Sequence, residues 1–358
     1  MRLAVALVAL CALVVVARAN ADADDVARRY HAWRAVHGRP DGRLAVWARN
    51  NALVERHNAD AAQSFRLGHN RFSDLTVREF HAAVGLTPLV AAPAGALREA
   101  PRALTSRGSS DDWWYGGGGG GHPAATEPEP EAVDWRAVPG VVSAVRDQGG
   151  CGSCWTFSAL GAIEGYEALR RNRTEPLALS EQQMLDCDRG SDGVQAGCAG
   201  GNPGMAQLWT LEAGGLEAEA AYPYTARQHV QCRHVAGHGL RPSHSQVYLV
   251  REGDEGALRQ AVRVQPVSVG MDASGALLQL YAGGVYRDAS CSRRNLNHAM
   301  LAVGYGAAAA AAAENGTTVP TWLLRNSWGA GWGDDGFFQL PRDAGNACGV
   351  ATMATFPR

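Results

Sequence analysis

The sequence has no strong charge of either sign. Its 358 residues include 33 Lys and Arg against 35 Asp and Glu, which gives a formal net charge of -2. Proteins that bind nucleic acid or anionic membrane surfaces usually carry a basic excess, so we expect no nucleic-acid partner. With 46% hydrophobic and 19% charged residues, the composition is that of a soluble globular protein. The chain is long enough for one sizeable catalytic domain and a smaller companion.

Long apolar runs are also absent, except at the amino terminus. There, Arg2 precedes an apolar run over residues 3–16, and the triplet Ala-Arg-Ala follows at 17–19. A positive start, a short apolar core and a small-residue exit are typical of a signal peptide, here residues 1–19. The alternative is a membrane anchor, but a span needs ~20 apolar residues and this run is shorter. We therefore expect entry into the secretory pathway, with a lysosome, a vacuole or the extracellular space as destination, and no membrane span in the mature protein.

Cysteine is missing from residues 12–150. Cys11 lies in the predicted signal peptide, and seven cysteines follow residue 150. In an oxidising compartment cysteines pair, and seven cannot all pair, so one thiol must remain, either for an intermolecular bond or as a reactive group. The triplets that begin at Asn172 and Asn315 are predicted glycosylation sites, which fits the same route.

The cysteine-free residues 20–86 have a helical pattern. Apolar side chains recur at helical spacing around Tyr30 and around Trp47, with a turn containing Pro and Gly between the two stretches. A capping box that begins at Thr76 predicts a third, short helix, which Gly85 ends. We therefore predict a small helical module.

Residues 87–131 lose this periodicity. They include six consecutive glycines at 116–121, which are entropically costly to order. We therefore predict a flexible linker that contains the processing site. The neighbouring Trp113, Trp114 and Tyr115 form either a docking patch or a chance exposed cluster.

Residues 132–358 have a globular composition again. Helical periodicity comes first, over residues 154–171 and after a second capping box at Ser180. After about residue 245, short apolar runs alternate with glycine-containing turns, which is typical of strands. This order predicts an α+β fold with two lobes and a site in the cleft between them. We interpret the alanines at 307–313 as a surface insertion.

The strongest chemical signal is the segment from Gln148 to Trp155, which ends in the pattern Cys-Gly-Ser-Cys-Trp. Because Cys154 begins the predicted helix, its sulfur is expected near the positive end of the helix dipole, which favours the nucleophilic thiolate. Gln148 and the backbone N–H of Cys154 are then candidate donors to an oxyanion. The alternative is a redox dithiol or half of a zinc site, which lacks a thioredoxin-like context and a second cysteine pair. We predict no metal and no cofactor.

A thiolate nucleophile needs an imidazole, and His298 is the candidate. It stands at the head of a predicted strand, whereas most other histidines after residue 131 lie among polar loop residues. It also follows Cys154 at the ~130–150-residue spacing typical of this nucleophile pattern. Asn326 follows the next predicted strand and is the candidate for orienting the ring, with Trp328 shielding their hydrogen bond from water.

These motifs resemble the papain family of cysteine proteases, in particular cathepsin L-like precursors. The resemblance rests on six blocks in the family's order, which begin at Val133, Gln148, Gly197, Ala221, Asn297 and Asn326. It implies a papain-like two-lobed α+β fold (residues 132–358), with a helical lobe and a β-barrel-like lobe, preceded by a helical inhibitory propeptide over residues 20–86. It also implies a free Cys154 and the disulfides Cys151–Cys198, Cys187–Cys232 and Cys291–Cys348.

The propiece resembles the family's propeptides through two motifs. A spaced pattern on its long helix appears as Arg43, Trp47, Asn50, Val54 and Asn58, although Arg39 stands where Glu is usual. The second motif appears as Gly68, Asn70, Phe72 and Asp74. The resemblance implies that the propiece blocks the cleft until it is cut away. Because carboxylates such as Asp74 and Glu79 lose their charge in acid, we expect self-processing at mildly acidic pH.

The resemblance also assigns roles to residues. Cys154 is the nucleophile, His298 the general acid and base, Asn326 the residue that orients the ring, and Gln148 the oxyanion donor. The implied substrate-binding positions are Gly200, Gly201, Asn202, Pro203, Gly270, Leu296, Asn297, Ala299, Trp328, Trp332 and Met353. Because the pocket second from the scissile bond has apolar walls, we expect a bulky hydrophobic substrate residue (P2) there.

We therefore expect a monomeric cysteine endopeptidase that acts on proteins or peptides. Its own propeptide is the expected intramolecular inhibitor, and cystatin-type proteins are candidate external ones. Two alternatives remain, a catalytically inactive papain-like binding protein and another Cys–His acyl-transfer enzyme such as a transglutaminase or an amidase. Exopeptidase action is disfavoured because no extra segment is recognisable that would block the cleft.

Overall fold

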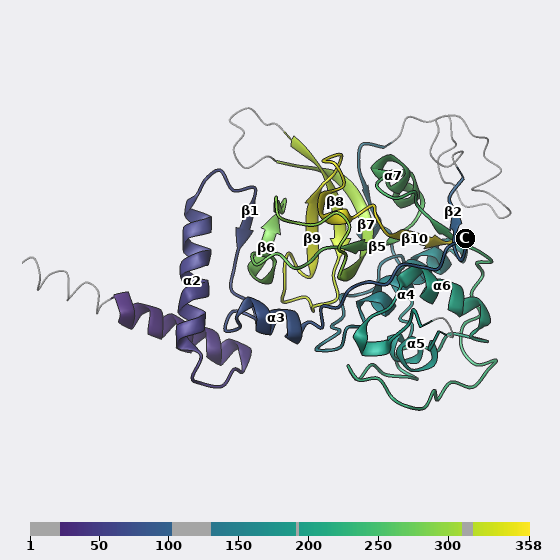
Figure 1. Ribbon diagram of the computed structural model, residues 1–358, viewed down its shortest axis with the longest axis horizontal. Coiled ribbons are helices and arrows are strands. Elements are labelled where there is room, and N and C mark those ends of the chain that lie inside the picture. The colour runs from purple at the N-terminus through teal and green to yellow at the C-terminus, as the bar shows by residue number, and fades with distance from the viewer. Residues whose placement is uncertain (1–21, 102–129, 191–192, 310–317) are drawn as a thin grey trace, which may run out of the picture.

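The computed structural model describes residues 22–101, 130–190, 193–309 and 318–358. A helical propiece lies against one side of a two-lobed domain, which has a sheet-rich lobe and a helical lobe (Figure 1). The predicted signal peptide, the aromatic cluster at 113–115, the glycine run and Asn315 lie outside the described residues.

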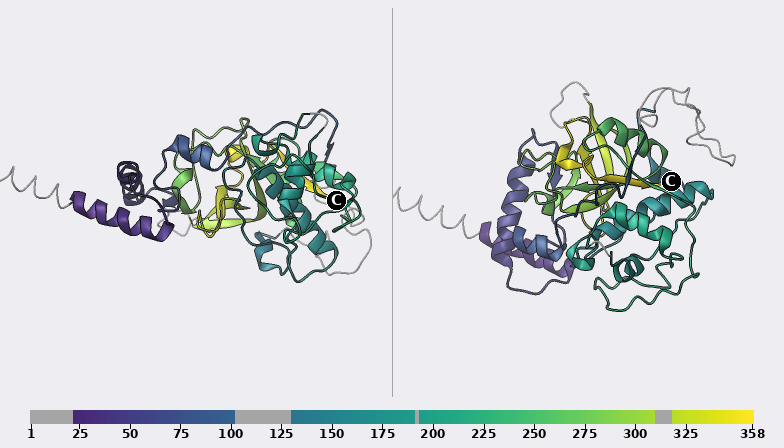
Figure 2. Two further views of the ribbon diagram at one scale, coloured as in Figure 1. Left: turned by 90° about the horizontal axis from the view of Figure 1, so that it is seen from below. Right: turned by 45° about the vertical axis from the view of Figure 1, so that its right-hand side comes forward.

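The propiece is built on two crossing helices, one over residues 22–37 and α2 (Leu44–Ala59), which Figure 2 shows from two further sides. They pack through the buried rings of Tyr30, Trp33 and Trp47. After α2 the chain forms the short strand β1 (Phe65–Leu67), which pairs antiparallel with β6 (Tyr281–Gly284) of the sheet-rich lobe. The predicted helical module is therefore attached to the rest of the protein through backbone pairing.

The third helix of the propiece, α3 (Val77–Ala83), has the predicted start and end. At its start, the Thr76 side chain accepts from the Glu79 backbone N–H, and the Glu79 carboxylate accepts from Thr76 in return. At its end, Gly85 adopts a left-handed φ of 60°, and the N–H of Leu86 donates to the carbonyl of His81 at 2.9 Å. This closure turns the chain sharply toward the cleft.

The helical lobe contains three α-helices among the described residues: α4 (Cys154–Arg170), α5 (Glu181–Cys187) and α6 (Pro203–Glu212). The long helix α4 is buried along almost its whole length, so it also packs against the sheet. The predicted capping box at Ser180 is only half formed. Ser180 accepts from the backbone of Gln183, but the Gln183 side chain bridges Gly215 and Glu217 instead.

The sheet-rich lobe contains one open sheet with the strand order β2-β4-β10-β5-β7-β8-β9, and β3 pairs with β7. The helix α7 (Glu255–Val264) packs against this sheet. The apolar core of the sheet-rich lobe also includes buried side chains of the propiece, such as Phe72 and Phe80. Among the described strands the sheet does not close into a barrel. The strands are β2 (Arg98–Glu99), β3 (Val133–Asp134), β4 (Val247–Leu249), β5 (Val267–Met271), β7 (His298–Ala309), β8 (Thr318–Arg325), β9 (Phe337–Pro341) and β10 (Ala354–Pro357).

Four short 3₁₀ turns complete the described elements. They are η3 (Trp135–Ala137), η4 (Gly197–Ala199), η5 (Leu278–Leu280) and η6 (Ala347–Gly349). The first three alanines of the run at 307–313 extend β7 and pair with β8, with Ala307 opposite Pro320, and the run continues beyond the described residues. The insertion therefore begins as a lengthened hairpin arm.

The first part of the expected linker is packed on the domain. Residues 87–101 cross both lobes, from the end of α3 to β2 (Figure 1), and β2 pairs parallel with β4. The periodicity of side chains gave no sign of this course, because several of its hydrogen bonds are made by backbone groups.

Candidate active site

Cys154 is the first residue of α4. Among the cysteines that the structure describes it is the free one, and the other six form the three pairs that the resemblance implies. The Cys151–Cys198 disulfide lies three residues before Cys154 and fixes the loop that leads into α4. The thiol is therefore held at a rigid helix start.

His298 is the first residue of β7, and the backbone of the next residue, Ala299, hydrogen-bonds the Cys154 thiol at the start of α4. Its Nε2 lies 2.8 Å from the Oδ1 of Asn326, just after the end of β8. The Nδ1 of the ring has no hydrogen-bond partner among the described residues. The indole of Trp328 lies against the imidazole, with ring centroids 4.6 Å apart. Asn326 therefore holds one nitrogen while the other stays available, and Trp328 covers the pair.

The thiol and the imidazole are both deeply buried in this form of the protein. Burial raises the pKa of Cys154 to about 11, although hydrogen bonds from the backbone of Ala299, Trp155 and Cys154 itself act in the opposite direction. Burial lowers the pKa of His298 to about 4, and the hydrogen bond to Asn326 offsets this only in part. The expected helix-start donors are therefore present, but desolvation outweighs them and keeps the pair uncharged.

Gln148 stands beside Cys154 with its side chain fixed at both ends. Its Oε1 accepts from the Ser327 hydroxyl at 2.6 Å, which sets the orientation of the amide. Its Nε2 donates to the Val84 carbonyl of the propiece at 2.9 Å and to the Cys151 carbonyl at 3.1 Å. The backbone carbonyl of Gln148 accepts from the Tyr224 hydroxyl at 2.8 Å. A peptide carbonyl is thus already held at the predicted oxyanion donor.

The propiece continues from Val84 directly over the cleft. A Cβ placed on Gly85 would lie 2.6 Å from the backbone of Cys151, and one on Gly200 would lie 2.9 Å from Thr87 Oγ1. These close approaches explain why small residues stand on both sides of the contact.

Further along, Leu89 enters the pocket expected to bind the P2 residue. Its N–H donates to the Leu296 carbonyl at 2.9 Å, and its Cδ1 would be 3.0 Å from a Cβ on Gly270. The next residue, Val90, accepts at 2.7 Å from the amide of Asn202, which also faces the sulfur of Met353. Four of the substrate-binding positions named from the sequence, Asn202, Gly270, Leu296 and Met353, therefore lie around Leu89 and Val90.

The other positions predicted from the sequence make contacts within the peptidase domain. Trp332 is fully buried, with its ring centroid 4.9 Å from that of Trp328, and it donates to the Leu278 carbonyl. Asn297 binds the backbone of Ala273, Pro203 opens α6, and Ala299 is buried in β7. Gly201 is needed against the ring of Trp155, which a Cβ would approach to 2.7 Å. Asn172 is exposed after α4, as a glycosylation site requires.

Sequence reasoning missed several residues that organise the site. Ser327 and Tyr224 lie within the quoted motif blocks but were not recognised as supports of Gln148. Val84 acts through its backbone carbonyl, and Leu89 acts by filling the pocket beside Gly270. Neither residue is part of a recognisable sequence motif. Among the described residues, no group of three or more His, Cys, Asp and Glu side chains is close enough together to hold a metal ion.

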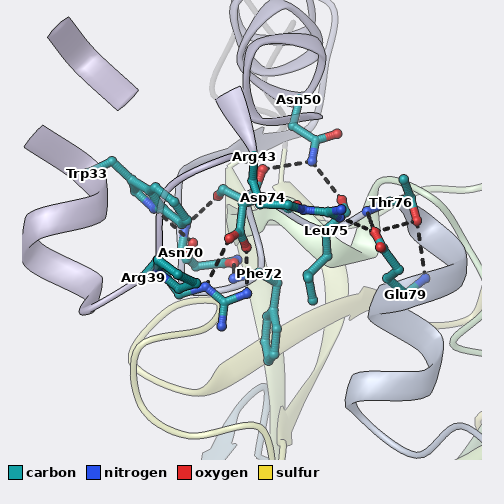
Figure 3. Close-up of polar contacts among 12 residues, drawn as sticks. Trp33, Arg39, Arg43, Asn50, Asn70, Phe72, Asp74, Leu75, Thr76 and Glu79 are labelled. Carbon is teal, nitrogen blue, oxygen red and sulfur yellow. Dashed lines mark hydrogen bonds and ion pairs between the residues drawn. The ribbon is translucent and has the colours of Figure 1, made fainter. Parts of the chain in front are cut away.

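The propiece is itself held in shape by a polar cluster, shown in Figure 3. Arg39 donates to both carboxylate oxygens of Asp74, at 3.0 and 2.8 Å. Arg43 binds the carboxylate of Glu79 and the carbonyl of Asp74. The cluster also includes hydrogen bonds of Asn50 to the carbonyls of Ser73 and Leu75 and of Trp33 to the carbonyl of Asn70. Arg39, which stands where the family usually has Glu, therefore forms an ion pair with Asp74, while Arg43 forms one with Glu79.

Comparison with protein families decides the identity of this arrangement. The model described as papain family cysteine protease matches residues 129–358, and the model described as cathepsin propeptide inhibitor domain (I29) matches residues 41–80. The chain belongs to the papain family of cysteine proteases. It is a protease precursor with a cathepsin-type inhibitor domain, and the two lobes and the propiece described above are those of a papain-family zymogen.

Relatives of this papain-family protease span nearly its whole length. Human cathepsin L2 is 34% identical over 372 residues, covering 100% of this chain and 99% of its own. Digestive cysteine proteinase 1 of Homarus americanus is 36% identical and covers 88% of this chain and 87% of its own. Among solved structures, digestive procathepsin L2 of Tenebrio molitor larvae is 31% identical with a TM-score of 0.76, covering 93% of this chain and 99% of that one.

Within the described residues of this papain-family zymogen, no helix is both long and apolar enough to cross a membrane.

Proposed function

We propose that this papain-family protease is an endopeptidase that cleaves proteins through a thioester on Cys154, with His298, Asn326 and Gln148 in the roles expected from the sequence. The observation that carries this proposal is the hydrogen bond from Gln148 Nε2 to the Val84 carbonyl. A group that holds an uncharged carbonyl in the zymogen is placed to hold the carbonyl of a scissile bond, whose oxygen becomes negative during attack.

The chemistry balances with these residues alone. The thiol proton of Cys154 moves to His298 as the sulfur attacks the substrate carbonyl, and Gln148 donates to the oxyanion. The C–N bond then breaks, His298 protonates the departing amine, and a thioester remains. His298 next takes a proton from water, whose oxygen attacks the thioester. The C–S bond breaks, the acid product leaves, and the proton returns to the sulfur.

We also propose a bulky hydrophobic P2 preference. Support comes from Leu89, which already occupies the pocket formed around Gly270, Leu296 and Met353. A fluorogenic peptide library should therefore favour Leu or Phe at P2. A preference for charged residues at that position would contradict the assignment.

The direction of the propiece explains how it avoids cleavage. A substrate runs from its P2 residue toward the scissile carbonyl, in the order of its sequence. The propiece runs the other way, because Val84 at the oxyanion donor precedes Leu89 in the pocket. A reversed chain presents no bond to Cys154 in the geometry for attack.

Acid activation is the expected route to the free enzyme, but Glu79 is not its trigger. Hydrogen bonds from the backbone and side chain of Thr76 and from Arg43 lower the pKa of this carboxyl to about 2. It therefore keeps its charge at mildly acidic pH, contrary to the expectation from the sequence. Self-processing within the stretch that joins the propiece to the peptidase, in a lysosome, vacuole or secreted fluid, stays our proposal.

The decisive experiment is mass spectrometry of acid-activated protein treated with a thiol-directed epoxide, beside a Cys154→Ala variant. We expect one adduct on Cys154 with loss of peptidase activity in step, and at least about 10⁴-fold lower activity in the variant. An unmodified and inactive protein whose propiece has left would instead support the binding-only alternative. An adduct without peptide hydrolysis would point to another acyl-transfer reaction.

A further inference from the structure

The strand β2 covers an edge of the peptidase sheet that belongs to no part of the reaction described above. Arg98 and Glu99 pair parallel with Tyr248 and Leu249 of β4, and the N–H of Ala100 donates to the Leu249 carbonyl at 2.8 Å. The other side of β4 is occupied by β10. Among the described strands, removal of the propiece leaves the outer backbone groups of β4 without a partner.

This edge continues the substrate cleft. From the P2 pocket the propiece passes the amide of Asn202, which caps the start of α6. Leu97 then lies over the first turn of α6, where a Cβ on Gly204 would meet its Cδ1 at 2.7 Å, and β2 begins at the next residue. One uninterrupted track therefore runs from the reacting centre over α6 to β4.

Polar side chains along the edge of β4 form contacts with side chains of the neighbouring strand β2. The guanidinium of Arg251 donates to the Glu99 carboxylate at 2.9 Å, and Gln246 accepts from Arg98 at 3.4 Å. Both sides of the Arg251–Glu99 pair are about half exposed, at 46% and 55%. The edge therefore offers a carbonyl acceptor and a cation to any extended chain beside it.

We propose that the edge of β4 is a second binding site for the amino-terminal part of a long, extended polypeptide substrate, with an acidic residue opposite Arg251. This inference rests on the proposed function, because it needs the P2 pocket and the cleavage direction given there. A substrate runs opposite to the propiece, so its upstream residues would lie antiparallel to β4. Antiparallel pairing is slightly more stable per residue than the parallel pairing of β2, and strand addition of this kind is a known mode of peptide recognition.

The site selects a class of substrate. A short peptide that fills only the pockets near Cys154 cannot reach β4. The propiece uses the residues between Leu89 and Arg98 to cover the distance and includes a turn at 93–96, so an unfolded chain needs fewer. Unfolded or loosely folded proteins with a long upstream segment are therefore favoured over short peptides and over compact folded proteins.

The test compares two fluorogenic substrates with one shared cleavage sequence. One substrate ends a few residues before the scissile bond, and the other extends about 12 residues further upstream. An extended chain spans ~3.3 Å for each residue, so the longer substrate has the length to reach β4. Acid-activated enzyme separated from its propiece should cleave the extended substrate with a kcat/KM about tenfold higher, mainly through a lower KM, as expected from one or two net backbone hydrogen bonds. An extension with N-methylated amides should lose this gain, because it cannot pair as a strand.

The charge contact is tested with the enzyme. An extension that carries Glu opposite Arg251 should be preferred over one that carries Lys, and Arg251→Glu should invert that ratio. Arg287→Glu is the matched control, because Arg287 is exposed and follows Tyr286, which binds Gln339 of β9 at the other end of the sheet. Its ratio should stay that of the unaltered enzyme.

Equal kcat/KM for short and extended substrates, with both cleaved, would overturn the second site and leave the proposed endopeptidase intact. A gain that survives N-methylation would also overturn it, because the gain would not come from strand pairing. Failure to cleave either substrate would instead contradict the proposed function itself.

Discussion

The propiece and the peptidase domain are stabilised in different ways. The peptidase domain holds three disulfides and a large continuous apolar core. The described part of the propiece, residues 22–101, has no cysteine. Its own core is a group of three aromatic rings, and part of its apolar surface is buried only against the peptidase. A region built in this way depends on its partner for stability and is suited to removal.

The ion pairs of the two regions differ in the same sense. In the peptidase, Arg146 binds the carboxylates of Glu164 and Glu181, which are almost completely buried. Loss of one member of such a cluster typically costs about 3–5 kcal/mol, because a buried charge loses its partner. In the propiece, Arg43 and Glu79 are 33% and 42% exposed, and pairs of that exposure contribute little. The Arg39–Asp74 pair of the propiece lies between these two cases, because Asp74 is 1% exposed and Arg39 is 33% exposed. The most deeply buried of these charge clusters is therefore in the peptidase.

The largest expected effect is on catalysis, and it is tested with two glutamines of the peptidase that both donate to carbonyls of the propiece. Gln148→Ala should lower kcat of the mature enzyme about 10²- to 10³-fold with little change in KM, because an oxyanion donor acts mainly in the transition state. Gln279 is the matched control. Its Nε2 also donates to propiece carbonyls, those of Phe72 and Leu75 at 2.7 and 2.8 Å, but these hydrogen bonds do not involve the loop that contains Cys154. Gln279→Ala should speed activation of the zymogen and leave kcat unchanged. Equal loss of kcat in both variants would contradict the proposed role of Gln148 as the oxyanion donor.

A smaller effect is expected in the propiece alone. Gly85→Ala should accelerate self-processing of the full-length zymogen more than tenfold, because its Cβ would meet the Cys151 backbone at 2.6 Å. Gly38→Ala is the control, since Gly38 has a similar φ of 59° but nothing within 4 Å of an added Cβ. That variant carries only the left-handed backbone penalty, about 1–2 kcal/mol. Processing is followed by gel electrophoresis at fixed pH, and equal rates for the two variants would contradict the contact.

The smallest expected effect concerns pH. His69 stacks on Trp47 with ring centroids 4.4 Å apart, and burial lowers its pKa to about 4 from an ordinary 6.5. Below pH 6.5 an unfolded propiece gains this proton while the folded one does not, because Trp47 and Asn51, which contact His69, belong to the propiece itself. The packed state is therefore destabilised as the pH falls from 6.5 toward 4.

Replacement of that group should move activation to lower pH. His69→Gln keeps an amide for the contact with Asn51 but does not titrate, so the midpoint of self-processing should fall by about half a pH unit. His31→Gln, at an exposed position of the same propiece, should leave the midpoint in place. An unchanged midpoint in His69→Gln would assign the pH response to other groups.

The residues proposed to carry the chemistry can be recognised in the sequence, because their signals are local. The pattern around Cys154, the strand after His298 and the turn at Asn326 each lie within a few residues. The course of residues 87–101 was not predictable, because Leu89 and Ala100 act through a backbone N–H and Val90 through a backbone carbonyl. Every residue type except proline offers both groups, so the side-chain pattern holds no trace of them.

The charge state of the site was also beyond prediction from sequence. The helix start indicated a thiolate at Cys154, and the expected backbone donors are present. The thiol and His298 are, however, both buried, and burial depends on packing between segments distant in the chain. The half-formed cap at Ser180 has a similar cause, because Gln183 satisfies a distant loop instead of its own helix.

Because the propiece and the peptidase are covalently linked, the volume of the compartment in which the link is cut affects when the enzyme becomes active. While both are one chain, Val84 meets Gln148 at an effective concentration of the order of mM. A single cut in the joining stretch turns this contact into an encounter between two molecules, whose occupancy falls on dilution. Enzyme processed inside a small, crowded compartment would stay silent there and begin to work when it is released into a larger one.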